Sequence, residues 1–320
     1  MNWFWFAIIA LLCWSGSDIF SKVGCCGEKD RTAHLKMITA VGLVMGLHAA
    51  YMVFFNDVAI SWDIIWRYLP VSLLYILSMA LGYVGLRYIE LSISSPICNS
   101  SGALVAVACL ISGDLADLVG VDRVVVLGAV ALVCLGVIGL GVVEAREDET
   151  LRAKRQEHAN RKYAKSWLAL CLPIAYCLLD AAGTFADSLV LETLNEDSAN
   201  VAYELTFLAA GVGCLIYLLA RREKFFVRQE APKYVAACFE TVGQLFYIYA
   251  LADEEHVALS APIISAYCVV SVLWSRLFLR EKLSWKHYAM ILLVVAGIVI
   301  LGVYDNIITS TGADRVVRPC

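Results

Sequence analysis

Charged side chains are scarce in this chain of 320 residues, where Asp, Glu, Lys and Arg together make up 17%. Apolar residues make up 61%, and the mean hydropathy is +0.74. A soluble domain contains about 25% charged and about 45–50% apolar residues. A soluble protein of this size could not cover so much apolar surface, which excludes a cytosolic enzyme and a nucleic-acid-binding protein. The composition therefore indicates a polytopic membrane protein with no nucleic acid among its partners.

Motifs for catalysis and for metal binding are also missing. The chain contains no phosphate-binding G-x-x-x-x-G-K-[ST] loop, no H-E-x-x-H zinc motif and no G-x-S-x-G nucleophile motif. Its 12 cysteines are scattered, mostly within apolar runs, and form no C-x-x-C pair. We therefore expect neither an enzyme nor an ATP-driven pump, and no catalytic residue, metal site or cofactor.

Ten apolar runs dominate the sequence, each bounded by charged or turn residues and long enough to cross a bilayer, which takes about 20 residues. They predict an all-α membrane protein with ten transmembrane helices, the first of which is retained and is not a cleaved signal peptide. The predicted spans are 2–23, 37–55, 68–88, 93–112, 124–143, 167–189, 201–220, 234–251, 257–278 and 288–303.

The distribution of Lys and Arg predicts the orientation of these spans. The loops that follow the odd-numbered spans carry 21 of the 25 Lys and Arg residues, and the other loops and the tail carry 4. Cytoplasmic loops of membrane proteins are enriched in Lys and Arg. We therefore expect the odd-numbered loops to be cytoplasmic and both termini to lie outside the plasma (inner) membrane.

The longest polar stretch, residues 144–166, carries alternating charges of both signs and is interpreted as a solvated cytoplasmic linker. It separates a first repeat (1–143) from a second repeat (167–304), which a tail (305–320) follows. At a shift of 166 residues Tyr83 meets Tyr249, Ser94 meets Ser260, and Pro96 meets Pro262. Each half has five spans, an odd number, so the two halves must cross the membrane in opposite directions. Inverted repeats of this kind are typical of secondary transporters.

Several motifs resemble the EamA-type repeat of the drug/metabolite transporter superfamily. They are a Ser-x-Pro start at 260–262, a Glu-Lys-Leu-Ser loop at 281–284 and a Gly-rich last span at 296–302, with Trp14 and Lys22 in the first span. The resemblance implies two five-helix EamA-like repeats and the transport of a small metabolite. The first half departs from the pattern at 112–120 and at Asp18, where the family usually has a neutral residue.

Acidic residues within the spans are the candidates for chemistry. An ionisable side chain in mid-membrane costs roughly 2.5–3.5 kcal/mol on insertion scales, so it faces the bundle interior, a wet cavity or a partner. Asp180 and Glu240 lie near the middle of their spans, and Tyr176 and Gln244 each lie one helical turn from one of them. We expect these four residues to bind a substrate or a coupling proton. The alternative for both carboxyl groups is a structural hydrogen bond.

The remaining candidates lie closer to the span ends. Trp14 could stack on a substrate, and Asp18 could face the cavity or pair with Lys22 one turn away. Glu204 could line the outer vestibule or be interfacial. Two further acidic and basic positions, Asp187 and His48, are interpreted as interfacial and structural. A last pair, Pro96 and Pro262, is interpreted either as helix starts or as hinges near the repeat interface.

These observations predict a secondary-active transporter that exports a small metabolite, amino acid or amine by alternating access. Its partners would be a small-molecule substrate, membrane lipid and a coupling proton. Two alternatives stay open. A lipid-linked sugar flippase predicts a groove that is open to lipid, whereas a non-transporting scaffold or receptor predicts no central polar cavity and tolerance of substitutions at Asp180 and Glu240.

Overall fold

The computed structural model describes residues 2–25, 30–88, 91–112, 121–145, 167–253, 256–278 and 283–310. These residues form helices and contain no strand, which confirms the predicted all-α fold. The helices are α1 (Trp3–Cys25), α2 (Ala33–Phe55), α3 (Trp62–Tyr88), α4 (Leu91–Cys98), α5 (Ser101–Ser112), α6 (Val121–Ala145), α8 (Trp167–Leu191), α9 (Glu196–Ala220), α10 (Val227–Leu251), α11 (Val257–Ser265), α12 (Tyr267–Phe278) and α13 (Trp285–Ser310). Residues 146–166 of the predicted linker, 311–320 of the predicted tail and 281–282 of the loop at 281–284 lie outside the described residues.

Length and hydropathy identify the chain as an integral membrane protein. Within the described residues, 9 helical stretches are long and apolar enough to cross a bilayer, and Trp285–Leu301 is a shorter apolar helix. Several helices extend past the predicted spans into polar sequence. One of them, α9, starts at Glu196 because the side chain of Asn195 accepts hydrogen bonds from the backbone amides of Asp197 and Ser198.

Two of the ten predicted spans are wrong in one respect, because each consists of two short helices. The span at 93–112 is interrupted at Asn99 and Ser100 between α4 and α5, and the span at 257–278 is interrupted at Ala266 between α11 and α12. The shift of 166 residues that aligns the two halves also places the first residue of α5 on the first residue of α12.

Pro96 and Pro262 lie shortly before these two interruptions, inside α4 and α11. A proline inside a helix cannot donate the backbone hydrogen bond that continues it. At the first interruption the side chains of Asn99 and Ser100 donate to the carbonyl oxygens of Ser95 (2.8 Å) and Pro96 (2.9 Å). Such side-chain donors satisfy backbone groups that the broken helix leaves free. The proposed role of the two prolines as hinges stays a prediction.

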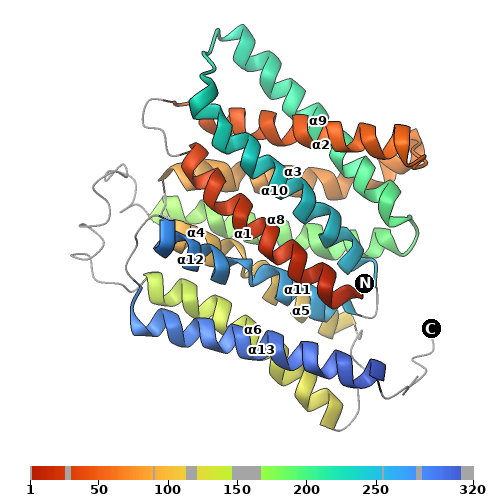
Figure 1. The fold of residues 1–320 in the computed structure, drawn as a ribbon, viewed down its shortest axis with the longest axis vertical. Helices are drawn as coiled ribbons and strands as arrows, with labels where there is room; N and C mark the ends of the chain where they lie inside the picture. The colour runs from red at the N-terminus through yellow and green to blue at the C-terminus, as the bar shows by residue number, and fades with distance from the viewer. Residues whose placement is uncertain are drawn as a thin grey trace.

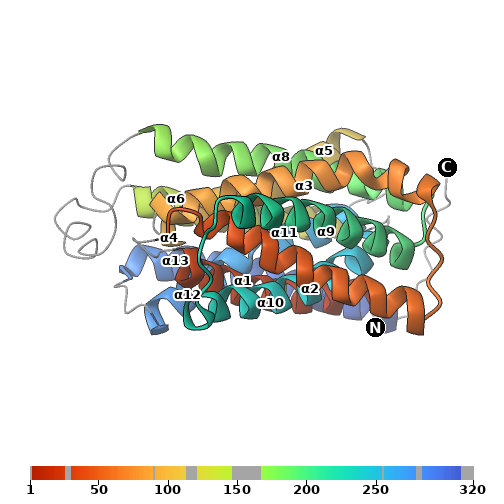
Figure 2. The ribbon, with the colours of Figure 1, turned by 90° about the horizontal axis from the view of Figure 1, so that it is seen from above.

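Helices of the first half pack against helices of the second half. In Figure 1, α2 and α9 lie along one edge, α6 and α13 lie along the opposite edge, and α1 and α10 cross between them. Figure 2 shows α3 and α8 on the opposite side of the molecule from α1 and α10. The broken helices α4–α5 and α11–α12 contact each other and pack against α1 and α8.

The places where the first and last helices begin and end are consistent with an even number of membrane crossings. In Figure 1, α1 begins and α13 ends at one end of the bundle, and α6 ends and α8 begins at the other. The side of the membrane that each end faces, and the opposite threading of the two halves, stay predictions.

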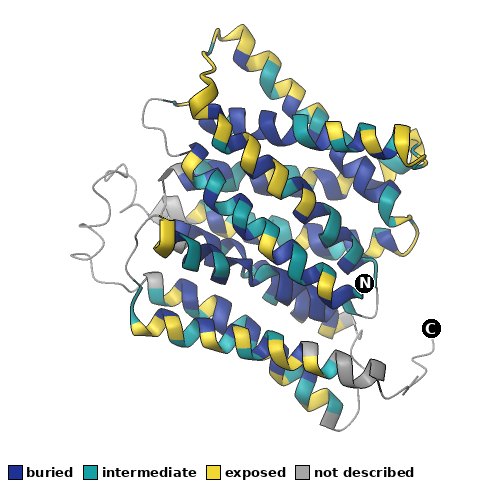
Figure 3. Cartoon of the chain, viewed as in Figure 1, coloured by how far each residue is buried: buried dark blue, intermediate teal, exposed yellow. Residues whose placement is uncertain are grey.

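Glycines allow the closest helix contacts. A Cβ atom added to Gly42 of α2 would lie 2.6 Å from the carbonyl oxygen of Phe207 and 2.9 Å from the Cα of Gly211, both in α9. Small residues are typical of membrane helix interfaces, because they let backbones approach. Large apolar side chains such as Phe54 and Ile111 are exposed. The broken span of α11 and α12 is largely buried, and Figure 3 shows buried residues concentrated in the middle of the bundle.

A buried ionic cluster joins the beginnings of α2 and α10. Lys36 pairs with Asp30 at 2.9 Å and lies 3.5 Å from Glu230, which pairs with Lys233 at 2.9 Å. Both lysine side chains are at most 3% exposed. Burial alone would raise the pKa of Asp30, but hydrogen bonds from Lys36 and Thr32 and the charge of Lys36 lower that pKa below its usual range.

Candidate functional site

A central pocket lies where the two halves meet. Residues of α1, α3, α8, α10 and both broken helices line it, with one residue of α9. Its empty space measures about 940 Å³, including the part that is open to solvent. The interruptions of α4–α5 and α11–α12 therefore border a cavity, the location where irregular backbone is tolerated at membrane depth.

Six of the seven predicted binding residues line this pocket: Trp14, Asp18, Tyr176, Asp180, Glu240 and Gln244. The structure therefore brings together side chains from α1, α8 and α10. Neither Pro96 nor Pro262 lines the pocket, and each belongs to the first helix of a broken span.

Glu204, the seventh candidate, is not among the lining residues. Its side chain is fully buried, and Oε1 lies 2.7 Å from Nδ1 of His48 and accepts a hydrogen bond from Asn200 at 3.2 Å. The structure therefore places Glu204 in the packing of α2 against α9. The contact between His48 and Glu204 agrees with the structural role that the sequence analysis expects for His48.

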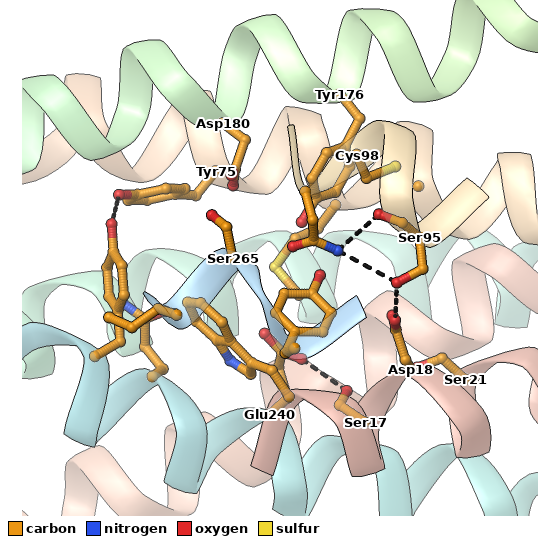
Figure 4. Close-up of a pocket in the computed structure, with 18 of the residues that line it drawn as sticks. Ser17, Asp18, Ser21, Tyr75, Ser95, Cys98, Tyr176, Asp180, Glu240 and Ser265 are labelled. Carbon is orange, nitrogen blue, oxygen red and sulfur yellow. Dashed lines mark hydrogen bonds between the residues drawn. The ribbon is translucent and has the colours of Figure 1, made fainter. Parts of the chain in front are cut away.

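Asp18 and Glu240 form one wall of the pocket, on the side of α1 and α10 (Figure 4). Glu240 accepts a hydrogen bond from Ser17 at 2.7 Å. Asp18 accepts hydrogen bonds from Ser95 of α4 at 2.6 Å and from Ser271 of α12 at 2.8 Å. The predicted Asp18–Lys22 pair is not what the structure shows. Asp18 contacts both broken helices, whereas Lys22 donates to the carbonyl oxygen of Leu86 at 2.7 Å.

Asp180 lies on the opposite wall, near Tyr176 and Tyr75 (Figure 4). It accepts a hydrogen bond at 2.7 Å from Ser101, the first residue of α5. The position is favourable for a carboxylate, because the N-terminus of a helix carries partial positive charge. Asp18 and Asp180 have comparable surroundings, since each lies in the first helix of one half and contacts a serine in the second helix of the other half's broken span.

The charge of the pocket has one sign. Its lining residues include the three carboxyl groups of Asp18, Asp180 and Glu240, and none of the described lining residues is Lys, Arg or His. Glu240 is within electrostatic reach of both Asp18 and Asp180. Like charges repel strongly in a medium of low dielectric constant. The cluster therefore favours a cation or bound protons in the space between the three groups.

Aromatic side chains surround these carboxyl groups. The lining includes Trp14 and six tyrosines, namely Tyr75, Tyr83, Tyr176, Tyr203, Tyr247 and Tyr267. The ring of Trp14 lies 4.9 Å from the ring of Tyr247 and 5.8 Å from the ring of Tyr267, centroid to centroid. The face of an aromatic ring attracts cations. The aromatic lining and the carboxyl groups thus favour the same kind of ligand.

Four buried polar groups of the lining have no hydrogen-bond partner in the described part of the protein: the hydroxyls of Ser21 and Tyr83, Nε1 of Trp14 and Nε2 of Gln244. The two nitrogen atoms can only donate. Trp14 packs against α10 one residue before Gln244, because a Cβ atom added to Gly243 would lie 2.7 Å from Nε1 of Trp14. An unsatisfied buried donor costs about 1–3 kcal/mol. These donors are therefore suited to a ligand that brings an oxygen acceptor.

Asp187, interpreted from the sequence as interfacial, is enclosed by protein, and its exposed fraction is 0%. Its depth relative to the membrane surface stays a prediction. Asp187 accepts hydrogen bonds from Tyr68 at 2.7 Å and from Tyr75 at 3.3 Å. One signal in the sequence pointed to it: Tyr176, Asp180, Thr184 and Asp187 are spaced by three or four residues and therefore share one face of α8.

The serines that hold the carboxyl groups were also missed. Ser17, Ser95, Ser101 and Ser271 give no sequence signal of their own, because serine is common in membrane helices as a small residue. No group of three or more His, Cys, Asp or Glu within the described ranges could hold a metal ion.

Comparisons with known proteins agree with the fold. Residues 167–303 match the EamA-like transporter family, which confirms the resemblance seen in the sequence. No curated protein matches the chain. Among solved structures 26 chains match. One, titled "Crystal structure of protein", is 14% identical, with a TM-score of 0.62, and the alignment covers 94% of this chain and 96% of that one. At this identity the likeness concerns the fold alone.

Proposed function

We propose that this EamA-like integral membrane protein is a secondary-active transporter that exports a small amine or amino acid through the central pocket by alternating access. One observation carries the proposal. Three carboxyl groups and seven aromatic side chains line a single pocket, and no basic residue is among the described lining residues.

The charge and the aromatic lining favour a substrate with a positive charge. A cation between Asp18, Asp180 and Glu240 would relieve the repulsion of their charges, and protons would do the same in its absence. Aromatic rings add about 0.5–2 kcal/mol for a cation that lies over them. A protonated amine meets both requirements. An anionic metabolite would meet three carboxyl groups and no cation.

The unpartnered donors favour a second feature in the substrate. Nε1 of Trp14 and Nε2 of Gln244 are both buried in the lining, and each could donate to an oxygen atom of a ligand. An amino acid carries an ammonium group for the carboxyl groups and a carboxylate for these donors. A simple amine would use only the first set of contacts. We therefore expect amino acids and hydroxyl- or carbonyl-bearing amines to bind more tightly than plain amines of the same size.

The arrangement of the helices supports alternating access. Each half contributes its first helix and its broken helix to the pocket, and the main helix pairs join one half to the other. Movement of one half against the other would therefore reshape the pocket from both walls. Transporters with discontinuous helices at a mid-membrane site work in this way.

A thermal-shift experiment with matched ligands tests the proposal. The purified protein is mixed with phenethylamine, L-phenylalanine, 2-phenylethanol or phenylacetate, which share a phenyl ring and differ in charge. The amine and the amino acid should raise the melting temperature, because a ligand at a hundred times its Kd stabilises the folded state by about 2.7 kcal/mol. The alcohol and the acid should not. The proposal would be contradicted if phenylacetate raised the melting temperature as much as phenethylamine does. It would also be contradicted if none of the four compounds raised it.

Flux measurements then separate transport from binding. Proteoliposomes should exchange labelled L-phenylalanine faster than protein-free liposomes. Binding without exchange would instead support a receptor. Movement of a lipid-linked sugar across the bilayer, without binding of any amine, would replace the proposal by the flippase.

A further inference from the structure

One carboxyl group lies outside the pocket and is not used by the proposed binding of substrate. Asp187 of α8 is 0% exposed and is not among the lining residues. No ion pair is found for it in the part of the chain that the structure describes. A buried carboxylate without a cation is costly in a membrane protein, and such residues often serve proton pathways.

Hydroxyl groups connect Asp187 to the pocket. Tyr75 donates to Oδ2 of Asp187 at 3.3 Å, and the same hydroxyl is hydrogen-bonded to the hydroxyl of Tyr247 and lies 3.3 Å from Oγ1 of Thr184. The hydroxyl of Tyr247 also lies 3.0 Å from Oγ1 of Thr184, so its one hydrogen can be donated either to Thr184 or to Tyr75. All three of these residues line the pocket. A continuous chain of hydrogen bonds therefore runs from the pocket to a carboxyl group that the pocket itself does not reach.

Tyr68 completes the surroundings of Asp187 on the other side. It donates to Oδ1 at 2.7 Å and does not line the pocket. The titratable groups that face Asp187 are Tyr68 and Tyr75 from α3, Tyr247 from α10 and Tyr203 from α9, and Asp180 lies two turns away on α8. None of these groups is a cation, so among the described residues only hydroxyl donors and protons can stabilise Asp187.

We propose that Asp187 is a proton-binding site, distinct from the carboxyl groups of the pocket, and that it exchanges its proton with the pocket through Tyr75. The inference rests on the proposed function of the pocket. A second carboxyl site would let one protein hold a substrate cation and a coupling proton at separate places that communicate through a few hydroxyl groups.

The transfer needs no group other than these hydroxyls and a proton donor in the pocket. A proton from pocket water or from a bound ammonium group passes to the oxygen of Tyr247. The O–H bond of Tyr247 then breaks as its own proton moves to the oxygen of Tyr75, and the proton of Tyr75 moves to Oδ2 of Asp187. The pocket has lost one proton, Asp187 has gained one, and both tyrosines are neutral again.

The same chain couples the proton to the substrate. When Asp187 is ionised, Tyr75 donates to it, and the oxygen of Tyr75 accepts from Tyr247. When Asp187 is protonated, it donates to Tyr75, and the hydroxyl hydrogens turn toward the pocket. An ammonium group in the pocket then faces hydroxyl hydrogens in place of the hydroxyl oxygens that could accept its hydrogen bonds. Substrate cation and proton should therefore disfavour each other, and by linkage the binding of one must release the other.

The first experiment measures protons released when phenethylamine binds to the purified protein in a weakly buffered solution. The wild type should release protons when the ligand binds, about one of them from Asp187 through the linkage of the two sites. Asp187→Asn should still bind the ligand and should release about one proton fewer per bound ligand than the wild type. Glu204→Gln, which removes another buried carboxyl group outside the pocket, should release as many protons as the wild type. Unchanged proton release in Asp187→Asn would overturn the proposal.

A second experiment needs no ligand, so it remains informative even if the pocket does not bind amines. Infrared spectroscopy follows the carboxyl band of Asp187 after a rapid pH step. Tyr75→Phe interrupts the chain and should slow proton exchange by about tenfold or more, which corresponds to about 1.4 kcal/mol in the barrier. Tyr68→Phe removes a hydroxyl group from the same carboxyl group without interrupting the chain, and exchange should stay fast.

The outcomes of the infrared experiment are decisive for Asp187 itself. If Asp187→Asn does not fold, the comparison of Tyr75→Phe with Tyr68→Phe still tests the route. A band that never changes with pH while the protein stays folded, or equal exchange rates in the two tyrosine variants, would overturn the proposal. Failure of phenethylamine to bind the wild type would instead count against the proposed function.

Discussion

Serine hydroxyls hold the three carboxyl groups of the pocket. Ser95 and Ser271 contact Asp18, Ser101 contacts Asp180, and Ser17 contacts Glu240. A serine orients a carboxyl group by donating a hydrogen bond but does not neutralise its charge. An Arg or Lys in the place of the serine would both orient the carboxyl group and neutralise its charge. The pocket therefore keeps its negative charge for a ligand or for protons.

Glu240→Gln should remove most of the affinity for phenethylamine. The amide keeps the size of the side chain and can still accept from Ser17, but it removes one of three charges from the pocket. A hydrogen-bonded charge pair contributes about 1.5–3 kcal/mol, so the Kd should rise at least about tenfold. Isothermal calorimetry measures the change.

Glu204→Gln is the matched control for that experiment, because Glu204 is also buried in a membrane helix but contacts His48 and Asn200 and not the pocket. Its Kd for phenethylamine should equal that of the wild type. A comparable loss of affinity in both variants would mean that Glu240 acts on the fold and not on the ligand.

At the residue scale, the sequence identified the carboxyl groups of the pocket but not their contacts. Asp180 and Glu240 were identified because a charge near the middle of an apolar run must face the interior. The enclosure of Asp187 was not predicted, because tyrosines from α3, more than 100 residues earlier in the chain, cover the carboxyl group. Contacts between distant segments leave no trace in the local sequence pattern.

Among the helices, the broken spans define the pocket most directly. Their apolar runs are uninterrupted, so hydropathy predicted two continuous helices. The prolines at 96 and 262 were noticed, but the interruptions come several residues later, at Asn99–Ser100 and at Ala266. Their position depends on side-chain hydrogen bonds from Asn99 and Ser100 and on packing against the other half. Both causes are tertiary and lie beyond a hydropathy pattern.

Gly42→Ala should destabilise the crossing of α2 and α9. The added methyl group would lie 2.6 Å from the carbonyl oxygen of Phe207, so the two backbones must separate. Overpacking of this kind costs about 1–3 kcal/mol. Gly213→Ala, in α9, provides the control, because nothing lies within 4 Å of its added methyl group. Thermal unfolding in detergent should show a lower melting temperature for Gly42→Ala and an unchanged one for Gly213→Ala. Equal melting temperatures would contradict the close contact.

At the scale of the whole molecule, the ionic cluster at one end fixes two helices from different halves. Lys36 of α2 contacts Asp30, Glu230 of α10 and the carbonyl oxygen of Lys224. Lys36→Met should cost about 3–5 kcal/mol, because it leaves buried carboxylates with one cation fewer. Arg67→Met breaks an exposed Arg67–Asp63 pair and should cost about 0–1 kcal/mol. A comparison of their unfolding in denaturant tests this difference.

The same cluster gives a pH dependence. Lys36 and Thr32 lower the pKa of Asp30 in the folded state. A depressed pKa stabilises the folded protein above the unfolded-state pKa of about 3.9, and this stabilisation is lost as the pH falls through the folded-state pKa. The wild type should therefore lose stability in acid more steeply than Asp30→Asn. Parallel stability curves for the two proteins below about pH 4 would refute this contribution.

The orientation of the molecule in the membrane is a separate prediction. An epitope tag at the C-terminus should bind antibody on intact cells, whereas a tag within 146–166 should bind only after the membrane is made permeable. The physical reason is the excess of Lys and Arg in the odd-numbered loops. The reverse pattern would invert the assigned sides while leaving the fold and the pocket as described.

The account depends most on a pocket whose carboxyl groups bind a positively charged small molecule. The most direct measurement compares the affinities of the wild-type protein for phenethylamine and 2-phenylethanol, which differ in an ammonium group and a hydroxyl group. We predict that phenethylamine binds at least about tenfold more tightly, a difference of about 1.4 kcal/mol. Equal affinities, or tighter binding of the alcohol, would contradict the account.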